Sequence, residues 1–361
     1  MNSPPRLTIR SIRARGLNLS LARPVETASG IMATTPLVLI DLATEEGVIG
    51  RSYIRCYTSV ALQPLVQLVT NLDGLIAGGD AAPELVERKL QHHFRLLGPQ
   101  GLTGIAMAGT DMALWDARAR ACGVPLVKLL GGQPGLIAAY ASLRTMQPRA
   151  AAQEAEEMLE LGFEAIKVKI GRSDLAADLE VIHAVRSAVG DHVKLMVDYN
   201  QSLSVSEAIT RVRALDELGL YWIEEPVRAD DFEGHARIAD ASRTAIQLGE
   251  NWWGPHDMEK SLRAHASDHV MLDVMKLGGV TGWLRAAALA EAHKLPASSH
   301  AFVEFSAHLL GVTPTAHWLE YLDHAGPILE EPIRIQRGRA EIPDRPGSAL
   351  EWNEERLAQL I

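Results

Sequence analysis

Short apolar runs that each end in a charged or imidazole side chain recur between residues 164 and 320 of this 361-residue chain. Three consecutive runs end at Asp198, Glu224 and Glu250, 26 residues apart, and the next three end after intervals of 23, 27 and 20 residues. This period accommodates one strand followed by one helix, so it predicts a series of βα units. The seven end residues are Lys169, Asp198, Glu224, Glu250, Asp273, His300 and Glu320.

The stretches between these runs are typical of helices. Residues 173–186 carry apolar side chains at helical spacing before a stop at Gly190, and residues 281–293 are Ala-rich. Ser204 and Glu207 match a capping box at the start of another helix. With residues 136–142 as the first strand, the runs complete eight strands. An α/β barrel of parallel strands places its functional side chains at the C-terminal strand ends, so we expect the seven residues to converge.

The rest of the chain predicts a second, smaller domain over the barrel mouth. Residues 6–55 are β-rich, residues 60–130 have helical patterns, and the Gly- and Pro-containing stretch 131–135 marks a boundary. We therefore predict an α+β capping domain over 1–130, a (β/α) barrel over 131–325, and a segment over 326–361 that returns to the cap. Residues 24–32 lack a helical period and are predicted to be a loop long enough to act as a lid.

Composition limits the kinds of molecule that the protein is expected to bind. A net charge of −10 argues against a nucleic-acid surface, and no apolar stretch approaches the roughly 20 residues that span a bilayer. The N-terminal residues contain no apolar leader region, and the two cysteines, Cys56 and Cys122, fit a reducing compartment. We expect a cytoplasmic protein that acts on a small molecule, without a nucleic-acid or membrane partner.

Three carboxylates at consecutive strand ends predict a metal site. Asp198, Glu224 and Glu250 would repel one another at one point unless a cation neutralised them. Oxygen ligands alone favour a hard ion, and three carboxylates completed by water and substrate suit Mg²⁺. The alternative interpretation is that each acid lies on the surface or caps a helix.

Basic residues surround the predicted metal. Lys167 and Lys169 share one strand face, where each would lower the pKa of the other, and a lowered lysine pKa suits a general base. Alternatively both point to solvent, with Ile166 and Val168 inside the barrel. Asp273 would orient His300 from the neighbouring strand, although His300 could be purely structural.

Glu320 has two possible roles, as a protonated hydrogen-bond donor or as the ion-pair partner of a lysine. A metal with a base on each side suits removal of the weakly acidic proton next to a carboxylate through an enediolate intermediate, because that charge needs strong electrostatic help. The substrate is therefore expected to be a small carboxylate.

The motifs around these residues resemble the enolase superfamily, mandelate racemase subgroup, over nearly the whole chain. The resemblance implies Mg²⁺ on the three carboxylates, Lys169 as one base, the His300–Asp273 dyad as the other, and Lys167 with Glu320 on the substrate carboxylate. It further implies that Asn200 and Ser142 approach substrate oxygens, and that the protein is a homo-oligomer. The matching segments are Lys167–Lys169, Val197–Ser202, Trp222–Pro226, Gly249–Trp252, Asp273–Gly279, Ser298–His300 and Thr313–Glu320.

Two positions depart from mandelate racemase and bear on specificity. Arg55, in the segment that ends at Tyr57, stands where that enzyme has an aromatic residue, and Ala301 replaces a larger aliphatic side chain. With Arg55 and Tyr57 as substrate-binding residues, we expect a hydroxylated or dicarboxylic hydroxy acid to be preferred over mandelate. Alternatively Arg55 points to solvent or pairs with Glu26.

Three functions remain open from the sequence. The first is a racemase or epimerase of an α-hydroxy acid, and the second is an acid-sugar dehydratase that uses the same residues. Both begin with the same enediolate, so the sequence does not separate them. The third is a non-catalytic barrel, which would leave the acid–base set without a role. A barrel hydrolase with a transition metal is disfavoured because the sequence contains no His-x-His pair.

Overall fold

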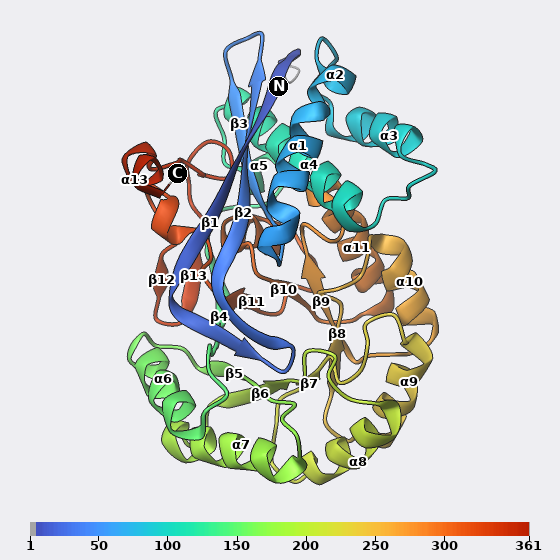
Figure 1. Cartoon of the computed structure of the whole chain (residues 1–361), viewed down its shortest axis with the longest axis vertical. Helices are drawn as coiled ribbons and strands as arrows, with labels where there is room; N and C mark the ends of the chain where they lie inside the picture. The colour runs from blue at the N-terminus through green and yellow to red at the C-terminus, as the bar shows by residue number, and fades with distance from the viewer. Residues whose placement is uncertain (1–4, 361) are drawn as a thin grey trace.

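The computed structural model describes residues 5–360, which form an α+β cap, at the top of Figure 1, and a barrel below it. The four N-terminal residues, part of the stretch without a leader pattern, and Ile361 lie outside this range. The cap contains a three-stranded antiparallel sheet in the order β1-β2-β3 with helices on one face. Its elements are β1 (Ile9–Thr27), β2 (Gly30–Thr44), β3 (Ile49–Arg55), η1 (Ser59–Ala61), α1 (Leu62–Asn71), α2 (Asp73–Ile76), α3 (Pro83–His93), α4 (Gly101–Ala121) and α5 (Leu126–Leu129).

Helix α4 packs directly against the cap sheet because a glycine on each side of the contact leaves room for residues of the other element. A Cβ on Gly109 would lie 2.5 Å from Ile40 Cδ1, and one on Gly50 would lie 2.0 Å from the Ala113 carbonyl oxygen. Both distances are shorter than carbon contacts allow, so larger residues would push the helix away from the strands. This packing anchors β3, whose last residue is Arg55.

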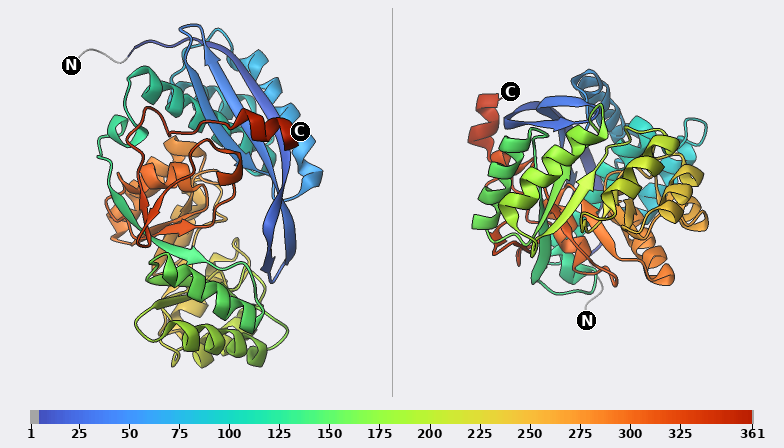
Figure 2. Two further views of the ribbon diagram at one scale, coloured as in Figure 1. Left: turned by 90° about the vertical axis from the view of Figure 1, so that its left-hand side faces the viewer. Right: turned by 90° about the horizontal axis from the view of Figure 1, so that it is seen from below.

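The prediction of an irregular loop at residues 24–32 is wrong. β1 continues to Thr27 and β2 begins at Gly30, so the segment is the end of a long hairpin that reaches from the cap down beside the barrel (Figure 2, left). The paired backbones supply hydrogen bonds that the side-chain pattern of a twisted, exposed ribbon does not reveal. A register shift between Ser20 and Val25 separates the tip from the rest of the pair.

The barrel has eight parallel strands in sequence order. β11 pairs with β4, and hydrogen bonds from Ala297 N to Thr315 O and from Ser299 N to Trp318 O join β10 to the segment before β11 and close the ring. The strands are β4 (Leu136–Ser142), β5 (Ala165–Lys169), β6 (Lys194–Asp198), β7 (Ile223–Glu224), β8 (Ile246–Leu248), β9 (His269–Asp273), β10 (Ala297–His300) and β11 (Leu319–Tyr321). The predicted fold class, a (β/α) barrel with an α+β cap, is confirmed.

The barrel helices lie where the apolar patterns predict them. Gly190 ends α7 with a φ of 75°, and the Ser204 side chain accepts from the Glu207 N–H at the start of α8. The reciprocal half of the predicted capping box does not form, because the Glu207 carboxylate binds Arg211 instead. The helices are α6 (Pro148–Glu160), α7 (Leu175–Val189), α8 (Val205–Leu215), α9 (Phe232–Ala241), α10 (Pro255–Arg263), α11 (Gly279–His293) and α12 (Val303–Leu310). None of the described helices is long and apolar enough to cross a membrane.

The C-terminal segment contacts both parts of the molecule. Its strand β13 pairs antiparallel with β4, and Trp352 Nε1 donates to Asp41 of the cap at 2.9 Å. Glu351 binds both Arg51 and Arg120, which also belong to the cap. The elements of this segment are η2 (Gly326–Ile328), β12 (Ile335–Gln336), β13 (Arg339–Glu341) and α13 (Glu354–Leu360).

Candidate active site

Strand register places the predicted site residues side by side. Lys169 is the partner of Asp198 across β5 and β6, Asp198 is the partner of Glu224 across β6 and β7, and His300 is the partner of Asp273. Because all of these strands run in parallel, their last residues share one level of the barrel. All seven strand-end residues lie at this mouth, beneath the cap.

The three carboxylates form one cluster. Asp198, Glu224 and Glu250 each offer an oxygen, and these atoms lie within 4.8 Å of one another. Burial raises the pKa of Glu224 to about 8, even though Lys167 opposes the shift. The donor set is made only of carboxylate oxygens, with no imidazole or thiolate in the cluster, and therefore fits a hard divalent cation such as Mg²⁺.

Each of the three acids accepts a hydrogen bond from a neighbouring residue. The Asn200 backbone and side chain donate to Asp198 at 2.8 Å, and Trp222 Nε1 donates to Glu224 at 3.0 Å. Asn251 donates to Glu250 at 3.1 Å. These contacts orient the oxygens toward the shared point, as supporting hydrogen bonds do around metal ligands.

The two lysines both point into the barrel, so the alternative of solvent-facing lysines is wrong. Lys167 Nζ lies 2.5 Å from Glu224 and 2.9 Å from Glu320, whereas Lys169 Nζ contacts Ser142 Oγ at 3.1 Å and the Leu143 carbonyl at 3.2 Å. Burial and the charge of Lys167 lower the pKa of Lys169. Burial also disfavours charged Lys167, but Glu224 and Glu320 outweigh it and hold its pKa well above the usual range. A lowered pKa is therefore found for Lys169, whereas the net pKa of Lys167 is raised because its carboxylate partners outweigh the effects that lower it.

On the opposite part of the ring, His300 and Asp273 form a dyad. His300 Nδ1 donates to Asp273 at 2.6 Å, which leaves Nε2 directed at the cavity, 3.4 Å from Glu250 and 3.8 Å from Glu320. Burial lowers the pKa of His300, but Glu250 and the hydrogen bond with Asp273 raise it to about 9. Burial disfavours ionised Glu320, but Lys167 and His300 reverse this and lower its pKa. Glu320 is thus an ion-pair partner and not a protonated donor.

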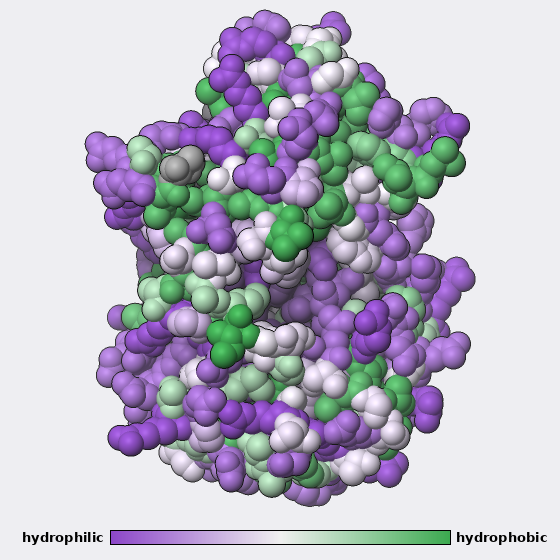
Figure 3. All heavy atoms as spheres, viewed as in Figure 1, coloured by the Kyte–Doolittle hydropathy of each residue, from purple (hydrophilic) through white to green (hydrophobic). Residues whose placement is uncertain are grey.

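A cavity of about 200 Å³ lies between the cap and the barrel and is lined by Lys167, Lys169, Asp198, Glu250, His300 and Glu320. Figure 3 shows a hollow with hydrophilic side chains near the middle of the drawn face. Asn200, Arg55 and Tyr57, which the sequence predicts as substrate-binding residues, line the cavity together with Met32 and Ser29 of the hairpin. Ser142 instead lies behind Lys169 as its hydrogen-bond partner and does not line the cavity.

Sequence reasoning missed several residues of the site. Asn251 donates to Glu225 and to Glu250 and accepts from Lys276, so it links three groups at the mouth. Asn251, Glu225 and Lys276 all lie within the motif segments of the resemblance, which could have indicated them. His324 contacts Arg55 at 3.0 Å, yet nothing in its surrounding sequence singles it out.

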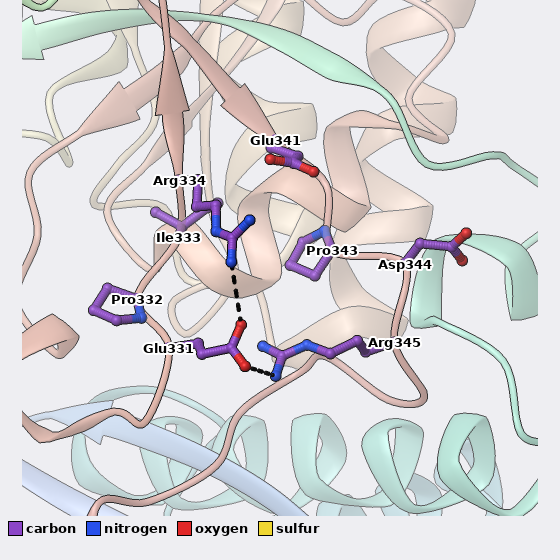
Figure 4. A pocket seen from close by; sticks show the side chains of 8 residues that line it. All are labelled: Glu331, Pro332, Ile333, Arg334, Glu341, Pro343, Asp344 and Arg345. Carbon is purple, nitrogen blue, oxygen red and sulfur yellow. Dashed lines mark hydrogen bonds and ion pairs between the residues drawn. The ribbon is translucent and has the colours of Figure 1, made fainter.

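A second crevice, also of about 200 Å³, lies in the C-terminal segment (Figure 4). Glu331 binds Arg345 at 3.0 Å and Arg334 at 3.7 Å across it. Glu331 and the two arginines therefore pair with one another, and none of the predicted site residues lines the crevice.

Comparison with known proteins agrees with this geometry. The chain matches the mandelate racemase/muconate lactonizing enzyme N-terminal domain over residues 10–131 and the enolase C-terminal domain-like family over residues 150–356. An enolase from Bradyrhizobium, solved in complex with magnesium and mandelic acid, is 43% identical over 99% of each chain, with a TM-score of 0.93.

Two curated relatives act on acid sugars, according to their names. The 3,6-anhydro-α-L-galactonate cycloisomerase of Streptomyces coelicolor is 32% identical over 94% of this chain and 95% of its own length. The L-talarate/galactarate dehydratase of Salmonella typhimurium is 29% identical over 93% and 87%. Solved neighbours contain magnesium, and Mg²⁺ is the cofactor of such enzymes. The chain belongs to the mandelate racemase/muconate lactonizing enzyme family of the enolase superfamily.

Proposed function

We propose that this enzyme is a racemase or epimerase that removes the proton next to the carboxylate of a 2-hydroxy acid and returns a proton to the same carbon. The observation that carries the proposal is that Lys169 and His300 line one cavity although they come from strands that are not neighbours. Two bases that approach one carbon from different directions allow removal on one face and delivery on the other.

The chain's own residues account for each proton. Lys169, with a pKa lowered by burial and by Lys167, accepts the α-proton from one substrate enantiomer, and the C–H electron pair passes into the enediolate. His300, oriented by Asp273, donates a proton to the other face, and the roles reverse for the opposite enantiomer. When bound at Asp198, Glu224 and Glu250, Mg²⁺ would stabilise the negative charge that develops on the substrate carboxylate. Lys167, which is held in place by its ion pair with Glu320, positions that carboxylate.

Acid-sugar dehydration is the second candidate. It uses the same α-proton abstraction, after which His300 protonates a leaving β-hydroxyl group so that water departs. Two observations favour it: Asn200, Gln201 and Arg55 give the cavity wall polar groups for hydroxyls, and a relative is named L-talarate/galactarate dehydratase.

Incubation in D₂O with Mg²⁺ and a panel of hydroxy acids and acid sugars tests both candidates. We expect wild type to exchange the α-proton, with inversion for a racemase or a 2-keto product for a dehydratase. Lys169→Ala and His300→Asn should each abolish inversion, and each should retain exchange from one enantiomer only. Exposed Lys89 and His293 offer matched controls, because Lys89→Ala and His293→Asn remove the same groups far from the site. Exchange of both enantiomers by His300→Asn would exclude the two-base arrangement.

A further inference from the structure

Arg55 is a buried cation at the cap side of the cavity. Its side chain ends β3, lines the cavity, and belongs to a residue that is only 5% exposed. The alternatives of a solvent-facing Arg55 and of a pair with Glu26 are both wrong. Glu26 accepts instead from Thr145 Oγ1 at 2.9 Å and from Met146 N at 2.8 Å.

The partners of Arg55 are all neutral groups. Nη1 donates to His324 Nε2 at 3.0 Å, Nη2 contacts Met32 Sδ at 3.4 Å, and the guanidinium lies 4.7 Å from the Tyr57 ring centroid. Burial and Arg55 itself hold the pKa of His324 well below its usual value, so the imidazole accepts without adding charge. Within residues 5–360, Arg55 forms no ion pair and its Nε has no hydrogen-bond partner.

The acids that line the cavity are engaged elsewhere. Glu320 binds Lys167, Glu250 lies beside His300, and Asp198 accepts from Asn200. A buried charge without a counter-ion is costly, and an incoming anion would remove that cost. The guanidinium presents parallel N–H groups that match both oxygens of a carboxylate, whereas a hydroxyl satisfies a single donor.

The position of Arg55 indicates which end of the substrate it contacts. Under the proposed function, the reacting carboxylate lies on the barrel side of the cavity, where Lys167 and Glu320 are. Arg55 enters the same cavity from the cap and addresses the far end of a bound molecule. We propose that Arg55 binds a second carboxylate there, so that the preferred substrate is a dicarboxylic 2-hydroxy acid. This inference rests on the proposed function for the orientation of the substrate.

Matched pairs of acids isolate the far-end group. Galactarate and galactonate, or glucarate and gluconate, share their chain and differ in a terminal carboxylate against a hydroxymethyl group. We expect wild type with Mg²⁺ to favour the diacid of at least one pair by about tenfold or more, both in kcat/KM for α-proton exchange and in calorimetric Kd. Arg55→Met, which keeps the side-chain length and removes the charge, should bring that ratio close to one.

A charge-matched control separates local binding from the general field of the protein. Arg228 is exposed near the barrel mouth and pairs with Asp230, outside the cavity. Arg228→Met should leave the diacid-to-monoacid ratio unchanged. A ratio that falls equally in both variants would overturn the proposal, since long-range attraction would then explain the preference.

His324 acts as a positioning residue for the guanidinium. In His324→Gln the amide oxygen can take the place of Nε2 as acceptor, whereas His324→Leu cannot accept. We expect the leucine variant to lower the diacid-to-monoacid ratio and the glutamine variant to restore much of it. Equal ratios in the two variants would contradict this role, whatever their stability.

The outcomes also separate this inference from the proposed function. If mandelate or the monoacids are better substrates and tighter ligands than every diacid, the dicarboxylate assignment is wrong, while exchange that depends on Lys169 and His300 would still support the reaction. Because calorimetric binding needs no turnover, diacid binding that depends on Arg55 without any exchange would support the subsite and refute the proposed reaction.

Discussion

At the scale of single residues, two side chains of the same type have different pKa values because their surroundings differ. Lys167 and Lys169 lie on one face of β5, yet Lys167 pairs with carboxylates, whereas Lys169 donates hydrogen bonds to a hydroxyl and a carbonyl. The pKa of the first is raised and that of the second is lowered. The neighbours, and not the residue type, make Lys169 the better base.

Removal of the metal should stop the reaction, because the carboxylate cluster cannot by itself stabilise a developing anion. We expect treatment with EDTA to abolish α-proton exchange and added Mg²⁺ to restore it. Glu224→Gln removes one charged ligand and should weaken Mg²⁺ binding about tenfold or more, measured by calorimetry. Glu233→Gln, an exposed change on α9, serves as the control. Full exchange in metal-free buffer would refute the metal site.

At the scale of elements, the β1–β2 hairpin couples the cap to the barrel. Its tip donates from Glu26 N to the Arg144 carbonyl at 2.7 Å, and Arg23 binds Glu157 of α6 at 2.6 Å. Val25, Thr27, Ser29 and Met32 of the same hairpin line the cavity. The hairpin therefore forms one wall of the cavity. Its contacts with the barrel determine whether that wall is in place.

Loss of the Glu26 carboxylate should loosen this wall. Charge-assisted hydrogen bonds contribute about 1.5–3 kcal/mol each, and Glu26→Ala removes two of them. We expect KM to rise several-fold and protease cleavage at the hairpin tip to become faster. Glu26→Gln keeps an acceptor oxygen and should lie between wild type and the alanine variant. Unchanged KM and cleavage in Glu26→Ala would show that other contacts hold the hairpin.

At the scale of the whole molecule, a few buried polar contacts join the cap to the barrel. Asp111 of α4 accepts from the Thr281 backbone N–H at 3.0 Å and from its hydroxyl at 2.5 Å, in the first turn of α11. Trp115 Nε1 donates to the same hydroxyl at 2.9 Å. Burial raises the pKa of Asp111 to about 7, although the bonds from Thr281 oppose the shift.

This junction should make stability depend on pH. The folded-state pKa of Asp111 lies above its value in the unfolded chain, so the folded state binds the proton more tightly. The stabilisation that protonated Asp111 gives to the folded state is therefore present at low pH and is lost as pH rises through about 7. Between pH 6 and pH 8, the free energy of unfolding of wild type should fall by about 1 kcal/mol relative to that of Asp111→Asn, measured by urea unfolding. A difference between the two proteins that stays constant with pH would contradict this assignment.

Much of the barrel and its strand-end chemistry is determined by local sequence. The 26-residue spacing of Asp198, Glu224 and Glu250 reflects a repeated strand and helix, and parallel pairing in register then brings their oxygens together. Because each unit folds by the same local rules, a period along the chain predicts a convergence in space. The same reasoning located Lys169 and His300.

Only the tertiary structure decided how the outer part of the site is built. Arg55 meets His324 across 269 residues of chain, and the hairpin tip reaches Thr145 and Met146 across about 120. Such contacts depend on how the cap and the C-terminal segment pack onto the barrel, and no local period encodes that packing. The pairing of Lys167 with Glu224 is of the same kind, since strand alternation predicts which way a side chain points but not which charge it will meet.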